Sequence, residues 1–303
     1  MRDSKEVVNL LCDAAIEGDL GRLKSLLVAH SSLMCSKNEN GDTPLYLAAV
    51  RGHNKMVRFL ITSGADVDSK DYDGRTPLHI ASEGCHKKLV KFLISKGADV
   101  NARNKQGFTP LHYAVHWGHR GVVKLLIKKG AYVNARDNNG MTPLHVADAY
   151  AVQILIANGA DFNAKDNNGD TTLHWAARRG DKELVIFYLT KGLVVDTKNN
   201  RGRTPLHLAA QCGRTHVVKL LISKGSNVNA KDEVGSTPLH IVVHNVPDRE
   251  IGVQELREIV DYLITKGAEV NAKDDHGLTP FDIAIQYSDG ITVDLLRQAR
   301  WRR

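Results

Sequence analysis

Six histidines recur at a nearly fixed spacing, and histidine is the side chain that most often serves as a metal ligand or acid–base catalyst near neutral pH. These residues are His79, His112, His145, His174, His207 and His240. Metal ligands must converge on one point, whereas one histidine per repeat would be spread along a stack at steps of roughly 10 Å, the usual helix-packing distance. We therefore interpret them as structural residues that hydrogen-bond between neighbouring turns, and we predict no metal site.

Short motifs for catalysis or phosphate binding are missing from the sequence. It contains no His-Glu-x-x-His, Gly-x-Ser-x-Gly, Gly-x-Gly-x-x-Gly or Walker-type glycine-rich string. The acidic pair Asp274 and Asp275 belongs to a repeated loop, so a catalytic carboxylate pair is not expected there. We predict that the protein is not an enzyme, has no catalytic residue and needs no cofactor.

The composition is that of an ordinary soluble folded chain, with 303 residues, 42% of them hydrophobic and 25% charged. No run of eighteen apolar residues is present, so no membrane-spanning helix is expected. The four cysteines lie far apart without Cys-x-x-Cys spacing, which indicates reduced thiols in a cytosol-like compartment. We predict a cytoplasmic protein, with the nucleus or a host-cell cytosol as alternatives.

The charge is basic, with a formal net charge of +7 and an isoelectric point near 9.1. This balance permits attraction to nucleic acid or anionic lipid but does not require it. Much of the lysine falls at helix ends such as "ISKGADV" and "IKKGAYV", where solubility alone explains it.

The elements that position these residues repeat along the chain. A threonine that begins a short phrase of the type Thr-Pro-Leu-His recurs at intervals of 33, 33, 33, 29, 33, 33 and 42 residues. It lies at Thr43, Thr76, Thr109, Thr142, Thr171, Thr204, Thr237 and Thr279. A fixed period near 33 indicates one supersecondary unit per repeat, each needing neighbours to bury its apolar face.

One unit, residues 74–103, shows the predicted plan. Thr76 can cap a helix, and Pro77 suits its first position, where a missing N–H costs nothing. After a turn, the apolar residues within 89–94 form the stripe of a second amphipathic helix, and Gly97 ends it. The sequence therefore predicts an all-α solenoid of stacked helix–turn–helix units joined by hairpin-like loops.

The five intact "TPLH" phrases, the "KGADVNA" type endings and the 33-residue period together resemble the ankyrin-repeat family. The resemblance covers residues from about 7 to 296 and implies nine units in one domain, 1–303. We expect an N-terminal capping repeat at 1–38, seven internal repeats at 39–275, a C-terminal capping repeat at 276–296 and a basic tail at 297–303. Atypical end units are what a solenoid needs to seal its ends.

Two internal units depart from the period. The fourth unit lacks four residues around the helix–helix turn, which removes about one helical turn. The seventh carries extra residues near 244–254, around Pro247, and "VQELREIVDYL" suggests a lengthened second helix. We expect the basic tail to be frayed and solvated.

The residues that the scaffold does not need are the candidates for binding. In ankyrin-repeat proteins, partners usually bind the concave side, formed by loop tips and the exposed edge of the first helices. The predicted partner-binding residues at those positions are Tyr72, Arg75, Phe108, His116, Trp117, Met141, Arg178, Arg179, Arg201 and Arg203. Aromatic residues and arginine dominate binding energy at protein interfaces, so we predict a groove over repeats two to six. The alternative is a scatter of exposed hydrophobic side chains, which is normal on protein surfaces.

The resemblance implies a non-catalytic protein–protein interaction scaffold or adaptor, monomeric, that binds a partner protein on its concave face. A second hypothesis is a basic adaptor that contacts nucleic acid or anionic membrane through Arg178, Arg179, Arg201, Arg203 and the tail. A steep salt dependence of binding would support it. A third is a host-directed effector of an intracellular bacterium that acts by binding a partner.

The resemblance also implies a possible modification. In animal cells, ankyrin repeats are similar to substrates of an asparaginyl hydroxylase that modifies a loop asparagine following Leu-x6-Val. The matching residues are Asn101, Asn134, Asn229 and Asn271. This is a property of the repeat and does not indicate a particular function.

Overall fold

The computed structural model describes residues 4–244, 252–287 and 290–301. Within these ranges the regular structure is helical, and the only β-type pairing is an isolated bridge between Lys165 and Thr171. The helices cluster into two compact units that divide between Asp161 and Phe162. The all-α helical solenoid predicted from the sequence is therefore confirmed.

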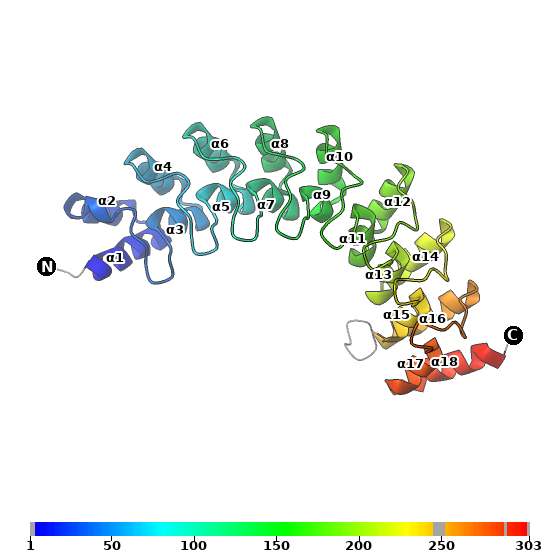
Figure 1. Ribbon diagram of the computed structural model, residues 1–303. Helices are drawn as coiled ribbons and strands as arrows, with labels where there is room; N and C mark the ends of the chain where they lie inside the picture. The colour runs from blue at the N-terminus through cyan, green and yellow to red at the C-terminus, as the bar shows by residue number, and fades with distance from the viewer. Residues whose placement is uncertain (1–3, 245–251, 288–289, 302–303) are drawn as a thin grey trace. The chain divides into compact units, whose positions relative to one another are not determined.

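The first unit alternates inner and outer helices, as Figure 1 shows in blue to green. The inner helices are α1 (Ser4–Glu17), α3 (Pro44–Val50), α5 (Pro77–Glu83), α7 (Pro110–His116) and α9 (Pro143–Val146). The outer helices are α2 (Leu20–Ala29), α4 (Asn54–Thr62), α6 (Lys87–Ser95), α8 (Arg120–Lys128) and α10 (Ala149–Ala157), with a short 3-10 helix at Ser31–Leu33. Each inner helix packs against the inner helices before and after it and against its own outer helix.

The second unit follows the same plan. Its inner helices are α11 (Thr172–Arg179), α13 (Pro205–Gln211), α15 (Pro238–His244) and α17 (Pro280–Gln286). Its outer helices are α12 (Lys182–Thr190), α14 (Thr215–Ser223), α16 (Val253–Thr265) and α18 (Gly290–Trp301).

The Thr-Pro-Leu-His phrase starts helices α5, α7, α9, α13 and α15, and its variant Thr-Thr-Leu-His starts α11; the histidine of the phrase caps the helix with its side chain. In the second repeat, His79 Nδ1 accepts the backbone N–H of Thr76 at 3.0 Å and lies 2.9 Å from its hydroxyl oxygen. The phrase leucine then packs into the core with at most 1% of its surface exposed at Leu78, Leu111, Leu144, Leu173, Leu206 and Leu239. The phrase therefore both sets the start of the helix and buries its first turn.

The second nitrogen of the histidine joins one repeat to the next. Because Nδ1 is an acceptor, Nε2 carries the proton, and His79 Nε2 donates to the Phe108 carbonyl at 3.0 Å. The same contact recurs from His112, His174, His207 and His240 to the next repeat. The predicted hydrogen-bonding role is thus confirmed for five of the six histidines, all except His145.

Burial keeps these imidazoles neutral. It lowers the pKa of His79, His112 and His207 from 6.5 to about 4, since a charged ring would lose its hydration inside the stack. Burial lowers the pKa of His174 and His240 as well. The fold therefore depends on these side chains staying uncharged.

The atypical units differ from the pattern at defined points. Helix α9 has four residues where α7 has seven, and α16 has thirteen residues where α14 has nine, so the helix lengths differ in the two units whose sequence departs from the period. The insertion around Pro247 lies outside the described residues. The prediction of a frayed tail from residue 297 is wrong for residues 297–301, which continue α18 to Trp301.

Candidate protein-binding site

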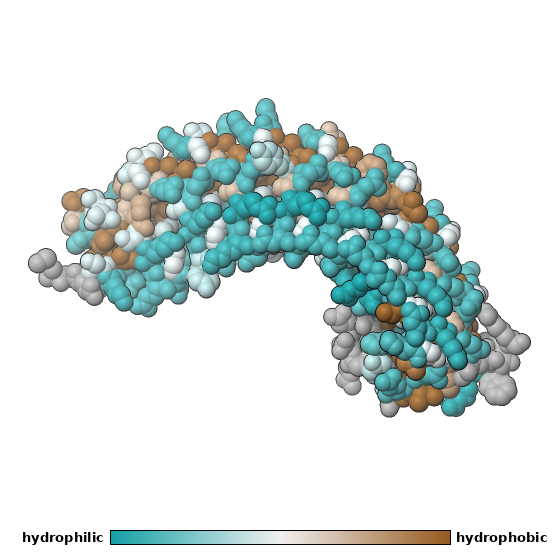
Figure 2. Space-filling model, in the orientation of Figure 1, coloured by the Kyte–Doolittle hydropathy of each residue, from teal (hydrophilic) through white to brown (hydrophobic). Residues whose placement is uncertain are grey.

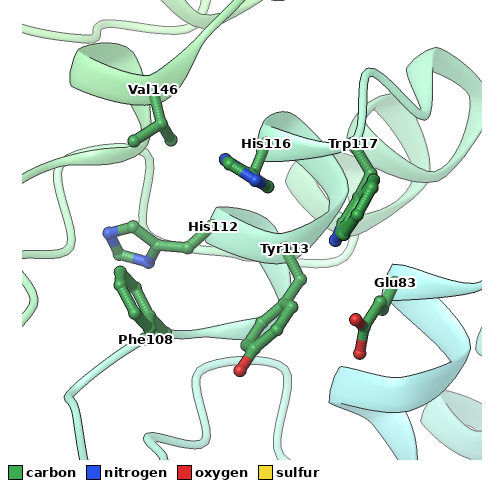
Figure 3. A pocket seen from close by; sticks show the side chains of 7 residues that line it. All are labelled: Glu83, Phe108, His112, Tyr113, His116, Trp117 and Val146. Atoms are coloured by element: carbon green, nitrogen blue, oxygen red, sulfur yellow. The ribbon is translucent and has the colours of Figure 1, made fainter. Parts of the chain in front are cut away.

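A cavity of about 310 Å³ opens beside the C-terminal half of α7. We call it the α7 pocket. Three of the predicted binding residues, Phe108, His116 and Trp117, line it together. The other residues that line it are Glu83, His112, Tyr113 and Val146 (Figure 3). The structure therefore brings one part of the predicted groove together into a single hollow.

The walls of the α7 pocket are aromatic rings in contact with one another. The Phe108 ring lies edge-on to His112, with centroids 5.6 Å apart, and to Tyr113, with centroids 6.0 Å apart. The imidazole of His116 meets the indole of Trp117 at 5.3 Å. The indole itself is 54% exposed, so a large apolar surface faces solvent at the pocket edge.

The shortened fourth repeat explains why this hollow stays open. Asp148 caps α10 by accepting the Ala151 N–H at 2.7 Å, and Asp181 does the same for Leu184 at 3.0 Å in the fifth repeat. Aligned on these two caps, the fourth repeat lacks the counterparts of residues 177–180. Those residues would extend α9 beside the end of α7, so their loss leaves the pocket uncovered on that side.

The α5 side of the pocket carries its one acidic group. Glu83 closes α5, and its carboxylate lies 3.7 Å from the guanidinium of Arg75. Arg75 also donates to Asp71 at 2.8 Å and to the Tyr46 hydroxyl at 2.5 Å. Arg75, predicted as a binding residue, is thus engaged in a network with Asp71, Asp73, Glu83 and Tyr46 at the rim of the pocket.

Two other predicted residues of the first unit lie apart from the pocket lining. Tyr72 is 71% exposed on a loop, with the Lys105 ammonium 4.1 Å from its ring centroid. Met141 is only 9% exposed and its carbonyl accepts from His112, so its side chain packs inside the stack and is not the exposed hydrophobe that the sequence suggests.

Four lining residues were not among the predicted binding residues: Glu83, Tyr113, Val146 and His112, the last of which was interpreted as structural. Tyr113 and Val146 occupy the position after the phrase histidine, which most repeats fill with a core-type side chain. Tyr113 is held by a hydrogen bond from Asn104 Nδ2 to its hydroxyl at 3.2 Å. Glu83 lies at the right helix edge, and its charge gave no reason to join it to an apolar groove. Two sequence features, considered together, could have identified them: the four-residue deletion in the fourth repeat and the aromatic residues of the third.

Four of the five predicted arginines, Arg178, Arg179, Arg201 and Arg203, lie in the second unit. Arg203 Nε donates to Asp232 at 3.3 Å, and its guanidinium reaches Gln211 at 3.3 Å. Arg178 lies 5.3 Å from the Trp175 ring. Arg179 and Arg201 are exposed on the surface of this unit. Arg178 and Arg203 therefore have contacts with neighbouring side chains of their own unit.

The asparagines proposed as modification sites connect successive repeats. Asn101 Nδ2 donates to the Gly130 carbonyl at 3.1 Å, and its Oδ1 accepts the Tyr132 N–H at 2.8 Å. Asn134 and Asn229 make the equivalent pair of bonds. Hydroxylation of these residues and of Asn271 stays a prediction.

The described residues hold no metal-binding cluster and no membrane-spanning helix. Among the described residues, no group of three or more histidine, cysteine or acidic side chains is placed to hold a metal ion. None of the helices described combines the length and apolar character needed to span a bilayer. The four cysteines are free thiols.

Comparison with known families agrees with the geometry. The family model described as "Ankyrin repeats (3 copies)" matches residues 11–104, 89–166 and 147–232, and the one described as "Ankyrin repeat" matches residues 234–275. The chain therefore belongs to the ankyrin-repeat family. Ankyrin repeats generally mediate protein–protein interaction, and the solenoid offers extended surfaces for it.

Among curated proteins, the chain is similar to the protein named "NAD-capped RNA hydrolase NUDT12" from Homo sapiens, Pongo abelii and Macaca fascicularis. Each match is 39% identical over 62 residues, which is 20% of this chain and 13% of the relative. The chain thus matches a small part of the length of these relatives.

Proposed function

We propose that this protein is a non-catalytic adaptor that binds a partner protein at the α7 pocket. The observation that carries the proposal is the half-exposed indole of Trp117 beside an aromatic-walled cavity. Interface hot spots concentrate on tryptophan, tyrosine and arginine that fill or border such pockets. A partner would insert an apolar side chain between Trp117, Tyr113 and Val146.

The lining of the pocket favours an apolar ligand group. Glu83 is the one acidic side chain among the lining residues, and at the rim it shares the Arg75 guanidinium with Asp71 and Asp73. The remaining lining is aromatic or aliphatic apart from two imidazoles. We therefore expect the pocket to select a leucine, methionine or aromatic side chain of the partner.

The hydrolase named among the relatives supplies no activity for this chain. The shared segment is 62 residues long and covers 13% of that protein. The basic-adaptor hypothesis has weak support, because Arg203 and Arg178 are engaged with neighbouring side chains. Partner binding at the α7 pocket is the function that the geometry favours.

The test is affinity capture from cell lysate with the wild type, Trp117→Ala and Tyr132→Ala. Tyr132 is 69% exposed on a loop that does not line the pocket, so it is a matched exposed aromatic. We expect a partner captured by the wild type to be lost with Trp117→Ala, since removing a hot spot costs about 2 kcal/mol or more. It should be retained with Tyr132→Ala. Equal capture by all three proteins would overturn the proposal.

A further inference from the structure

The outer helices of the first unit carry a one-sided charge. Helices α2, α4, α6 and α8 hold ten basic residues and no acidic residue. The ten are Arg22, Lys24, Lys55, Arg58, Lys87, Lys88, Lys91, Arg120, Lys124 and Lys128. We call this set the basic outer row. Helices α12, α14 and α16 of the second unit instead hold three basic and four acidic residues.

Nearly all of these cations lack an acidic partner in the described part of the chain. Arg22 pairs with Glu17 at 2.9 Å, and the other nine make no ion pair there. In the second unit, by contrast, Lys219 on α14 pairs with Glu258 on α16 at 2.5 Å. The basic outer row therefore projects a positive field that its own unit does not neutralise.

Helix stability does not account for this pattern. Lys55, Lys87, Lys88 and Arg120 lie in the first turns of their helices, where the helix dipole disfavours positive charge by about 0.3–1 kcal/mol. These helices also lack the acidic residues that would favour a first turn. The first-turn cations therefore cost some stability within the chain, and a bound anion would offset that cost.

Aromatic rings hold several of the cations in place. Lys24 lies 5.0 Å from the ring centroid of Phe59, and the Arg58 guanidinium lies 4.2 Å from that of Phe92 on the next outer helix. Arg120 covers Tyr150 in the same way at 3.9 Å. These rings are covered by cations of the chain itself, so they are not free to stack on the bases of a single-stranded nucleic acid.

The convex shape of the basic outer row limits which anionic partners can contact it along its whole length. In the first unit, the outer helices lie on the convex side, with charged and apolar side chains interspersed along them (Figures 1 and 2). A flat membrane or a rigid duplex would touch a convex row over a short length. An extended polypeptide rises about 3.3 Å per residue, so about three residues span each helix-to-helix step of roughly 8–10 Å.

We propose that the basic outer row binds an extended acidic segment of a partner polypeptide, with carboxylates spaced about one per repeat. This surface is separate from the α7 pocket. A segment of about ten to twelve residues reaches from α2 to α8. Such binding is steered by long-range attraction and weakens as salt screens the charges.

The test uses a fluorescein-labelled peptide of about twelve residues with glutamate at every third position, followed by fluorescence anisotropy. The outer-row variant replaces Lys55, Lys88 and Lys91 with glutamine; none of the three contacts a carboxylate or a ring. The control replaces Lys182, Lys224 and Arg257 of the second unit with glutamine, which removes the same net charge. We expect the outer-row variant to lose about tenfold in affinity and the control less than about twofold.

Two further probes separate this proposal from its rivals. Vesicles containing phosphatidylserine and a random DNA duplex are titrated with the same proteins, and Trp117→Ala is included to report on the pocket alone. We expect the peptide to bind the wild type and Trp117→Ala alike. Three results would each overturn the proposal. The peptide does not bind, the two charge variants lose equal affinity for it, or the outer row binds vesicles or duplex more tightly than the peptide.

Discussion

The third and fifth repeats share one backbone plan and present opposite chemistry at matched positions. The pairs are Phe108 and Asp170, Tyr113 and Trp175, His116 and Arg178, and Trp117 and Arg179. Both repeats cap the inner helix with the phrase histidine and bury the phrase leucine. The difference therefore lies wholly in the residues that the scaffold leaves free.

The consequences of that difference are visible in the contacts. In the fifth repeat, Trp175 Nε1 donates to Asp166 at 3.1 Å, and Asp170 accepts from Asn199 at 2.7 Å, so the polar groups satisfy one another. In the third repeat, the rings of Phe108 and Tyr113 pack together beside a cavity. In the fifth repeat the polar groups bond to one another, whereas in the third repeat apolar ring surface stays exposed to solvent.

The largest expected effect is the loss of stability at low pH, which arises from the buried phrase histidine that the two repeats share. The folded-state pKa of His79, His112 and His207 is about 4, below the unfolded value near 6.5. The contribution of these neutral histidines to the free energy of unfolding is therefore fully present above pH about 6.5 and is lost as pH falls toward 4. The reason is that in this range the unfolded chain binds more protons than the folded chain. Each shift corresponds to about 3 kcal/mol when fully expressed.

Thermal unfolding followed by circular dichroism between pH 7.5 and 4.5 checks this. Replacing the exposed His276 with glutamine is the control and should leave the profile unchanged. A melting temperature that stays level down to pH 4.5 would contradict the role given to the buried histidines.

The second effect tests the origin of the pocket. Inserting Ala-Arg-Arg-Gly between Ala147 and Asp148 restores the four residues that the fourth repeat lacks relative to residues 177–180. We expect α9 to lengthen over the end of α7 and cover Trp117, so that partner affinity falls about 30-fold, the effect of losing a hot spot of about 2 kcal/mol. Quenching of tryptophan fluorescence by acrylamide should fall as well. Unchanged affinity in a folded insertion variant would separate the deletion from binding.

The smallest effect separates stability from binding. Cys85 has a left-handed backbone with φ of 59°, at a turn position filled by glycine in the third and fifth repeats. Cys85→Gly should raise the free energy of unfolding by about 0.5–1 kcal/mol, since strain is relieved and part of the gain is lost to unfolded-chain entropy. Urea denaturation measures this. Partner affinity should not change, because Cys85 does not line the pocket.

Much of the fold was predictable because the same local signals for helix start and packing recur in successive repeats. Thr76, Pro77 and His79 specify a helix start by hydrogen bonding and steric fit alone, and the same phrase specifies it again further along. The site was predictable only in part. Phe108 and Trp117 stood out as aromatic residues at edge positions, but the burial of Met141 depends on packing between repeats that no local pattern reveals.

The pocket itself depends on two features that lie in different repeats. The deletion in the fourth unit and the aromatic residues of the third are separately visible in the sequence. Their combination becomes apparent only when Val146 is seen to end α9 beside His116. The engagement of Arg75 with Tyr46, 29 residues away, is likewise a consequence of stacking.

The most direct test of the central claim places a photo-reactive phenylalanine analogue at position 117 in one protein and at the matched position 179 in another. Each is irradiated with the captured partner, and covalent adducts are identified by mass spectrometry. The account predicts an adduct from position 117, mapped to an apolar side chain of the partner, and none from position 179. An adduct from position 179 alone would contradict it and assign binding to the fifth repeat.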